Sequence, residues 1–150
     1  MATKIQKVLL TGKSRTSPVG RRDSAGAEDH VDIQLSSPQA PQQGYTFEDV
    51  QPHPTAEQLF AGAWSACYIT ALGLMAKQKK VELPPDLAIE LEVDLGVAGS
   101  AYLLQARLGV LLPGLPQDVA DDIAHAADEI CPYSKATRGN VEVSLSVVTR

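Results

Sequence analysis

The sequence predicts an α+β domain in which two strands, a helix, two strands, a second helix and a final strand follow one another. Segments that alternate apolar and polar residues, as half-buried strands do, lie on both sides of a long apolar run with helical spacing. A second helical pattern follows a proline, and a last alternating segment closes the chain. The 150 residues, 44% of them hydrophobic, suffice for one domain with a sizeable core, which we expect to span residues 1–150.

The first half of the predicted fold begins with two strands. We expect the first over residues 4–11 and the second where Val31, Ile33 and Leu35 alternate with polar residues. The segment SPVGRRDSAGAED between them is rich in turn-forming residues and carries two arginines. The stretch rich in Pro and Gln over residues 36–54 predicts a loop.

A long helix is expected to begin at Thr55, because Thr55 and Gln58 form the pattern of a capping box. The helical pattern fades at residues 77–80, before two prolines at 84 and 85. This helix is apolar nearly all round, so we expect more than one layer to bury it and a dimer interface to form on it. Apolar or small residues recur at helical spacing at Leu59, Phe60, Ala63, Cys67, Thr70, Ala71, Leu74 and Met75.

The second half repeats the pattern with two strands, a helix and a strand. The expected elements are strands at 87–95 and 104–112 around a turn at 96–100, a helix opened by Pro116 and ended by Pro132, and a strand at 141–147. The outer face of that helix is acidic, which is most simply a solvated face.

Composition and charge exclude several classes of protein. A net charge of −5 argues against binding to a nucleic-acid backbone, which requires clustered Lys and Arg. The apolar stretch at the start is too short for a signal peptide, and no run approaches the roughly 18 apolar residues of a membrane span. We therefore predict a cytoplasmic protein with neither nucleic acid nor membrane as partner. In the reducing cytoplasm, we expect a disulfide between the two cysteines to be transient and catalytic rather than structural.

The two cysteines, Cys67 and Cys131, suggest dithiol redox chemistry. The simpler alternative is that both are inert, buried thiols in a binding or interaction domain, since reactivity requires an accessible, electropositive setting. A cysteine hydrolase would pair Cys67 with His30, His53 or His125, none of which lies in a recognisable motif. A metal site is not expected, because there is no C-x-x-C and there are no paired histidines.

The stretches PTAEQLFAGAWSACYITAL and CPYSKATRGNVEVSLSV closely resemble the organic hydroperoxide resistance proteins, one branch of the OsmC superfamily of thiol peroxidases. The upstream VGRRDS resembles the arginine loop of that family, so the resemblance covers nearly the whole chain. It implies an OsmC-like fold, with antiparallel sheets around long central helices in an intertwined homodimer.

The resemblance also implies roles for four residues. Cys67 would be the peroxide-reducing thiol, Cys131 the resolving thiol, Arg22 the activating cation and Glu57 the carboxylate that holds the arginine. A cation is needed because burial alone raises the pKa of a thiol, and only the thiolate attacks a hydroperoxide. The resemblance further implies that Cys67 and Cys131 form a disulfide, which a lipoyl group on a partner protein reduces, rather than thioredoxin. It implies no cofactor bound to the chain itself.

The arginine loop departs from the pattern of that family. Where the family has Gly-Gly-Arg-Asp-Gly, this chain has Gly-Arg-Arg-Asp-Ser, so Arg21 and Ser24 replace two glycines and a contribution from Arg21 stays open. Without the resemblance, Arg22 would be read as a solvated charge and Glu57 as a first-turn acid favoured by the helix dipole.

Helix geometry limits how Glu57 reaches Cys67. Ten residues of unbroken helix separate them by about 15 Å and leave their directions about 80° apart. Either the helix bends, for example near Gly62, or the Glu57 beside each Cys67 comes from a partner subunit. We favour the second, because an isologous dimer would bury the apolar helix.

Three apolar residues before Cys67 are candidates for binding the substrate. Phe60 and Ala63 lie on its helical face and Trp64 lies near that face, so an alkyl chain has an apolar surface to contact. We therefore expect a preference for organic hydroperoxides over hydrogen peroxide.

Overall fold

The computed structural model describes residues 3–19, 30–37 and 54–150, and confirms the predicted α+β class and the order of the predicted elements. One short helix, α3, was not predicted. The elements are β1 (Lys7–Val19), β2 (His30–Ser36), α1 (Ala56–Lys79), β3 (Ala88–Ala98), β4 (Ala101–Leu111), α2 (Gln117–Ile130), α3 (Pro132–Thr137) and β5 (Glu142–Val148).

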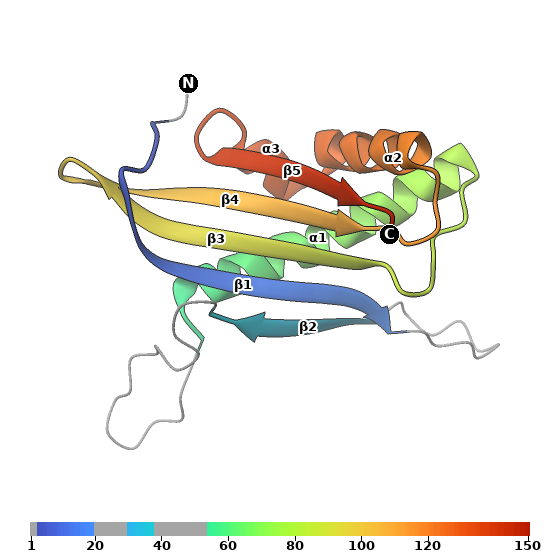
Figure 1. The fold of residues 1–150 in the computed structure, drawn as a ribbon, viewed down its shortest axis with the longest axis horizontal. Coiled ribbons are helices and arrows are strands. Elements are labelled where there is room, and N and C mark those ends of the chain that lie inside the picture. Colours follow the sequence, from blue (N-terminus) through green and yellow to red (C-terminus); the bar gives the residue numbers. More distant parts are fainter. Residues whose placement is uncertain (1–2, 20–29, 38–53) are drawn as a thin grey trace, which may run out of the picture.

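The described strands form a five-stranded sheet in the order β2-β1-β3-β4-β5 (Figure 1). Helix α1 packs against β1 and β3, while α2 packs against α1 and β5. All neighbouring strands are antiparallel except β4 and β5, which are parallel. The sheet is therefore antiparallel, as expected, except at β5, because α2 and α3 form a crossover connection that returns the chain in the direction of β4.

Helix α1 begins where the sequence predicts. The backbone N–H of Gln58 donates to Thr55 Oγ1 at 3.2 Å, and the backbone N–H of Thr55 donates to Gln58 Oε1 at 2.9 Å. Both bonds of the predicted capping box are therefore formed. At the other end, Lys80 has φ 57°, and its N–H donates to the carbonyls of Ala76 and Lys77, which ends the helix in the left-handed conformation.

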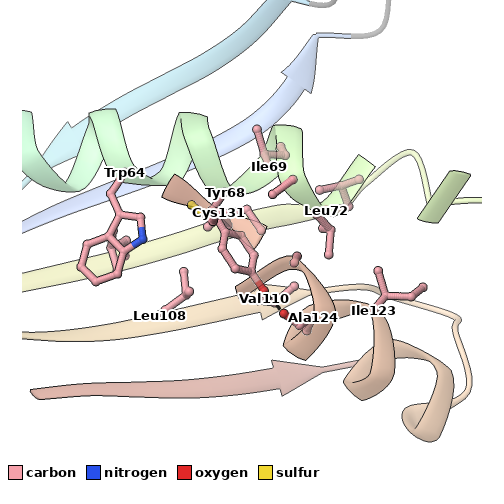
Figure 2. Close-up of a cluster of buried hydrophobic side chains, with 14 of the residues drawn as sticks. Trp64, Tyr68, Ile69, Leu72, Leu108, Val110, Ile123, Ala124 and Cys131 are labelled. Carbon is pink, nitrogen blue, oxygen red and sulfur yellow. Dashed lines mark hydrogen bonds between the residues drawn. The ribbon is translucent and has the colours of Figure 1, made fainter. Parts of the chain in front are cut away.

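The two sides of α1 are buried to very different degrees. Trp64, Tyr68 and Leu72 point into the core, as Figure 2 shows. None of the three has exposed surface. Leu59 and Leu74, on another side, are 55% and 56% exposed. The sheet and α2 both pack on α1, as expected for a helix buried by more than one layer, but the single chain leaves an apolar strip of α1 uncovered.

The length and composition of α1 also correct the expectation that no run could cross a membrane. Its most apolar 18-residue window has a mean hydropathy of 1.5, which is sufficient for a span. Half of that window is buried inside the protein. A buried core helix passes the same test of length and hydropathy, so the finding is weak support for a membrane span.

Several boundaries differ from the sequence prediction for local reasons. Strand β1 extends to Val19, well beyond residue 11, because it pairs with β3 on one edge and β2 on the other. The turn between β3 and β4 contains only Gly99 and Ser100, and Gly96 belongs to β3. Pro132, expected only to stop a helix, is the first residue of α3, where a missing N–H costs nothing.

A buried carboxylate lies on the sheet face opposite the helices. Asp94 is 2% exposed and accepts hydrogen bonds from Arg107 at 2.6 and 2.9 Å, from Gln105 at 2.6 Å and from Thr11. Burial acts to raise the pKa of Asp94, but the bonds from Arg107, Thr11 and Gln105 outweigh it and hold the pKa below its usual value. The ionised carboxylate thereby joins β1, β3 and β4.

This lowered pKa predicts how stability depends on pH. Because the folded pKa of Asp94 is lower than the unfolded value of about 3.9, its contribution is complete above that value and is lost as pH falls through the folded pKa. We expect Asp94→Asn to lose about 2–4 kcal/mol of unfolding free energy at pH 7 and to lose less than the wild type on acidification below pH 4.

Urea unfolding at pH 7 and pH 3 measures both effects. Asp86→Asn, at an exposed position, is the matched control and should change stability by less than about 0.5 kcal/mol. Equal pH dependence in the wild type and Asp94→Asn would contradict the assignment.

Candidate active site

The structure brings the two cysteines together from distant parts of the chain. Cys67 lies in the middle of α1, and Cys131 lies at the joint between α2 and α3. Their Sγ atoms are 3.5 Å apart, and both are free thiols. A disulfide has an S–S distance of about 2.05 Å, so its formation requires an approach of about 1.5 Å.

The two thiols differ in access to solvent. Cys131 has no exposed surface, whereas Cys67 is partly exposed. The backbone of Cys131 is held on both sides, because its N–H donates to the Ala127 carbonyl at 2.9 Å and its carbonyl accepts from the Lys135 N–H at 3.0 Å. A dissolved molecule therefore reaches Cys67 first, and Cys131 lies behind it as part of a helix junction.

The described surroundings of Cys67 raise its pKa. Burial is the largest cause, and the neighbouring Cys131 adds to it, while a hydrogen bond from the backbone N–H of Tyr133 partly opposes both. These groups alone keep the thiol neutral at neutral pH, so a thiolate requires a further positive charge. Arg22, the predicted cation, and Arg21 lie outside the described residues.

Two aromatic side chains of α1 form buried hydrogen bonds to the helices that carry Cys131. Trp64 Nε1–H donates to Ser134 Oγ in α3 at 3.1 Å. The Tyr68 hydroxyl donates to the Ala124 carbonyl in α2 at 2.7 Å (Figure 2). Burial raises the pKa of Tyr68 strongly, so its hydroxyl remains a donor. These bonds join α1 to α2 and α3 on either side of the thiol pair.

The three predicted substrate-binding residues have different settings. Ala63 is exposed and Phe60 is partly exposed, so both offer apolar surface on α1. Trp64 is fully buried, and its ring contacts that of Phe60 edge to face at 5.6 Å. The expectation for Trp64 is corrected accordingly, because its indole points into the core to reach Ser134 and offers no surface to a ligand.

Glu57 lies in the first turn of α1 and is only 9% exposed. Strand β1 crosses this turn very closely at Gly12, where an added Cβ would lie 2.3 Å from the Gln58 nitrogen. Only glycine permits this approach. Helix α1 runs without interruption through Gly62, so the ten residues between Glu57 and Cys67 separate them along one helix.

The remaining alternatives for Cys67 find little support in the described ranges. His125 is exposed on α2, whereas the described hydrogen bonds of the Cys67 sulfur involve Cys131 and Tyr133. His53 and the side chain of His30 are not described. Among residues 3–19, 30–37 and 54–150, no three His, Cys, Asp or Glu side chains cluster as metal ligands would.

Sequence analysis missed Tyr68, Tyr133 and Ser134 as parts of this site. Tyr133 and Ser134 belong to the CPYS stretch that begins at Cys131. Pro132 could have revealed a helix there, because its fixed φ suits the first turn of a helix. A helix beginning there directs the Tyr133 amide toward Cys67 and brings Ser134 within reach of Trp64.

Comparison with known proteins identifies close relatives. Residues 48–146 match the model of the OsmC-like protein family. The chain is 33% identical over 143 residues to an organic hydroperoxide resistance protein of Xanthomonas axonopodis pv. citri, covering 95% of this chain and 96% of that one. The crystal structure of the organic hydroperoxide resistance protein OhrB of Bacillus subtilis superposes with a TM-score of 0.61 at 31% identity, covering 89% of this chain and 96% of that one.

A second solved structure, an organic hydroperoxide resistance protein from Elizabethkingia anophelis, has a TM-score of 0.62 at 26% identity and covers 90% of this chain and 94% of that one. The agreement in both sequence and structure extends over most of the chain. The predicted family resemblance is confirmed.

The unequal burial of the two thiols predicts unequal alkylation. We expect iodoacetamide to modify Cys67 in the folded, reduced protein and to reach Cys131 only after denaturation, because Cys131 has no exposed surface. Mass spectrometry of peptides after timed quenching measures both rates, with the urea-denatured chain as control. Equal labelling of the two cysteines in the folded protein would contradict this order, and a Cys67 as unreactive as Cys131 would favour inert thiols.

Proposed function

This chain belongs to the OsmC-like family, in its organic hydroperoxide resistance branch, and from that membership we propose that it reduces organic hydroperoxides with the thiol of Cys67. One observation carries the proposal: the partly exposed Cys67 sulfur lies 3.5 Å from the sulfur of the buried Cys131. A peroxidatic thiol has to be accessible, and a resolving thiol has to be adjacent. These two cysteines meet both requirements.

In the first step, the Cys67 thiolate attacks the terminal oxygen of the hydroperoxide. The O–O bond breaks, the alkoxide takes a proton and leaves as an alcohol, and the OH group remains on Cys67 as a sulfenic acid. Phe60 and Ala63 supply apolar surface on α1 for the alkyl group. Hydrogen peroxide has no such group and gains nothing from this surface.

In the second step, the Cys131 sulfur attacks the sulfenic sulfur of Cys67. An S–S bond forms, the S–O bond breaks, and hydroxide leaves with the thiol proton as water. The 3.5 Å separation supports this step, since it needs only a small displacement of the helices. The disulfide protects Cys67 from further oxidation.

In the third step, a dithiol reduces the disulfide by thiol–disulfide exchange. We propose a dihydrolipoyl group on a partner protein, because its alkyl arm can contact the same apolar surface as the substrate. Both sulfurs of the dithiol are oxidised to a ring disulfide, and both cysteines return to thiols. A cycle of this kind suits a reducing compartment, in agreement with the proposed cytoplasmic location.

Activation of Cys67 requires a cation, and we propose Arg22 held by Glu57. The raised pKa of Cys67 among the described residues supports this need. A homodimer offers the geometry, because Glu57 and Cys67 lie ten residues apart on a continuous helix and the exposed Leu59 and Leu74 leave apolar surface for a second copy. Glu57 would then act on Cys67 of the partner subunit.

The proposal predicts selectivity for organic hydroperoxides. We expect stopped-flow oxidation of the reduced protein by cumene hydroperoxide to be orders of magnitude faster than oxidation by hydrogen peroxide, because each buried methylene contributes about 0.8 kcal/mol when the contact persists in the transition state. Cys67→Ser should abolish turnover, while Cys131→Ser should permit one oxidation and block recycling. Turnover with dihydrolipoamide should exceed turnover with thioredoxin.

Each arm of this experiment tests a different part of the proposal. Normal turnover in Cys67→Ser would refute the assigned thiol, and equal rates for the two peroxides would refute the apolar contact. Better recycling by thioredoxin would refute the lipoyl reductant alone.

The arginine assignment predicts a difference between two neighbouring residues. Arg22→Ala should raise the pKa of Cys67 and slow its oxidation at pH 7, because the thiolate loses its cation. Arg21→Ala is the matched control and should have a mild effect. Thiolate absorbance against pH measures the pKa of Cys67 in each variant. Equal pKa shifts in the two variants would contradict the assignment of Arg22 over Arg21.

A further inference from the structure

Three contacts in a row join α1 to the helices on either side of Cys131. Trp64 bonds to Ser134, the Cys67 thiol contacts the Cys131 thiol, and Tyr68 bonds to Ala124. Residues 64–68 span only about 6 Å of helix, so the three contacts are close neighbours. In Figure 2 the side chains of Trp64 and Tyr68 leave α1 on the side where Cys131 lies.

The two hydrogen bonds hold different helices. Tyr68 bonds to α2, whereas Trp64 bonds to Ser134 of α3. The Cys67 sulfur also accepts a hydrogen bond from the Tyr133 N–H of α3, but Trp64–Ser134 joins two side chains. Arg138, just after α3, donates to the carboxylate and the backbone carbonyl of Asp128, both at 2.9 Å. The Arg138–Asp128 contact holds α3 against α2 but does not fix the distance between α3 and α1.

There is room for α3 to move. A hollow of about 260 Å³ lies beside the Trp64–Ser134 contact. Its lining includes Thr137 and Arg138, together with Val143 and Leu145 of β5. Helix α3, of only six residues, therefore lacks dense packing on this side. The hydrogen bond from Trp64 to Ser134 therefore helps to hold α3 in place on the side where packing is loose.

The position of α3 matters because two reactions compete for the sulfenic acid of Cys67. Attack by Cys131 gives the disulfide, whereas a second hydroperoxide gives an irreversible sulfinic acid. The first reaction requires the two sulfurs to close from 3.5 Å. A displaced α3 moves Cys131 away and favours the second.

We propose that Ser134 is a positioning residue for disulfide formation: by accepting the Trp64 hydrogen bond it holds Cys131 in reach of oxidised Cys67. This inference rests on the proposed function and deepens it. Ser134 and Trp64 have 3% and 0% exposed surface, so the hydrogen bond between them is buried, and loss of one partner costs more than it would at the surface. In this role Ser134 acts through the backbone of α3, which begins directly after Cys131.

The test separates the two oxidation steps in Ser134→Ala. With cumene hydroperoxide, loss of the Cys67 thiol should keep its wild-type rate within about twofold, while disulfide formation should slow about tenfold or more. The sulfenic acid should accumulate and be trapped by dimedone, and sulfinic acid should form at lower hydroperoxide concentration. Acid quenching, alkylation and mass spectrometry measure all of these species.

Thr137→Val is the matched control, because it removes an equally buried hydroxyl of α3 that bonds only to the Tyr133 and Ser134 carbonyls of its own helix. Both rates should stay near the wild type. Ser134→Thr keeps a hydroxyl acceptor and should restore disulfide formation. Trp64→Phe removes the donor and should slow the same step, which tests the inference even if Ser134→Ala does not fold.

The outcomes distinguish the inference from the function on which it rests. Wild-type disulfide formation in Ser134→Ala or in Trp64→Phe, or an equal loss in Thr137→Val, would overturn the role of Ser134 and leave the peroxidase intact. A wild-type protein that forms no disulfide with hydroperoxide would instead overturn the proposed function.

Discussion

The packing of one face of α1 into the core is the constraint on which the site depends. Trp64, Tyr68 and Leu72 anchor the helix by burying their whole side chains, and two of them also bond to the neighbouring helices. Cys67 lies between the buried face and the exposed strip, so its sulfur meets both the core and solvent. A rotation of α1 about its axis would bury this thiol fully or detach it from Cys131.

This placement creates an electrostatic problem that the described residues solve only in part. The burial that brings Cys67 to Cys131 also disfavours its thiolate and raises its pKa. The Tyr133 amide opposes this effect, because α3 begins directly after Cys131 and directs an N–H at the sulfur. A single neutral donor does not overcome the cost of burial, which is why we propose a cation beside Cys67. The fold thus brings the two sulfurs together while raising the pKa of Cys67.

How much the sequence predicted depended on whether a local signal existed. The start of α1 was predictable from Thr55 and Gln58, since a capping box is a contact within one turn. The parallel pairing of β5 was not, because strand direction depends on the crossover and leaves no mark on the alternation of residues. The burial of Trp64 was missed for a related reason: helical spacing placed it near Cys67, but its partner Ser134 lies 70 residues away.

The difference in solvent access between the two thiols also decides which sulfur of the disulfide is attacked in the proposed reduction step. Once the disulfide forms, Cys131 remains behind Cys67 in the helix junction, held by backbone bonds to Ala127 and Lys135. An incoming thiolate therefore reaches the Cys67 sulfur and expels Cys131 as the leaving thiol. The mixed disulfide then forms on Cys67, on the apolar surface beside Phe60 and Ala63. In the proposed cycle, substrate and reductant would therefore share one entrance, and each would have to leave before the other binds. An extended apolar arm would suit this surface better than the broad face of a folded protein.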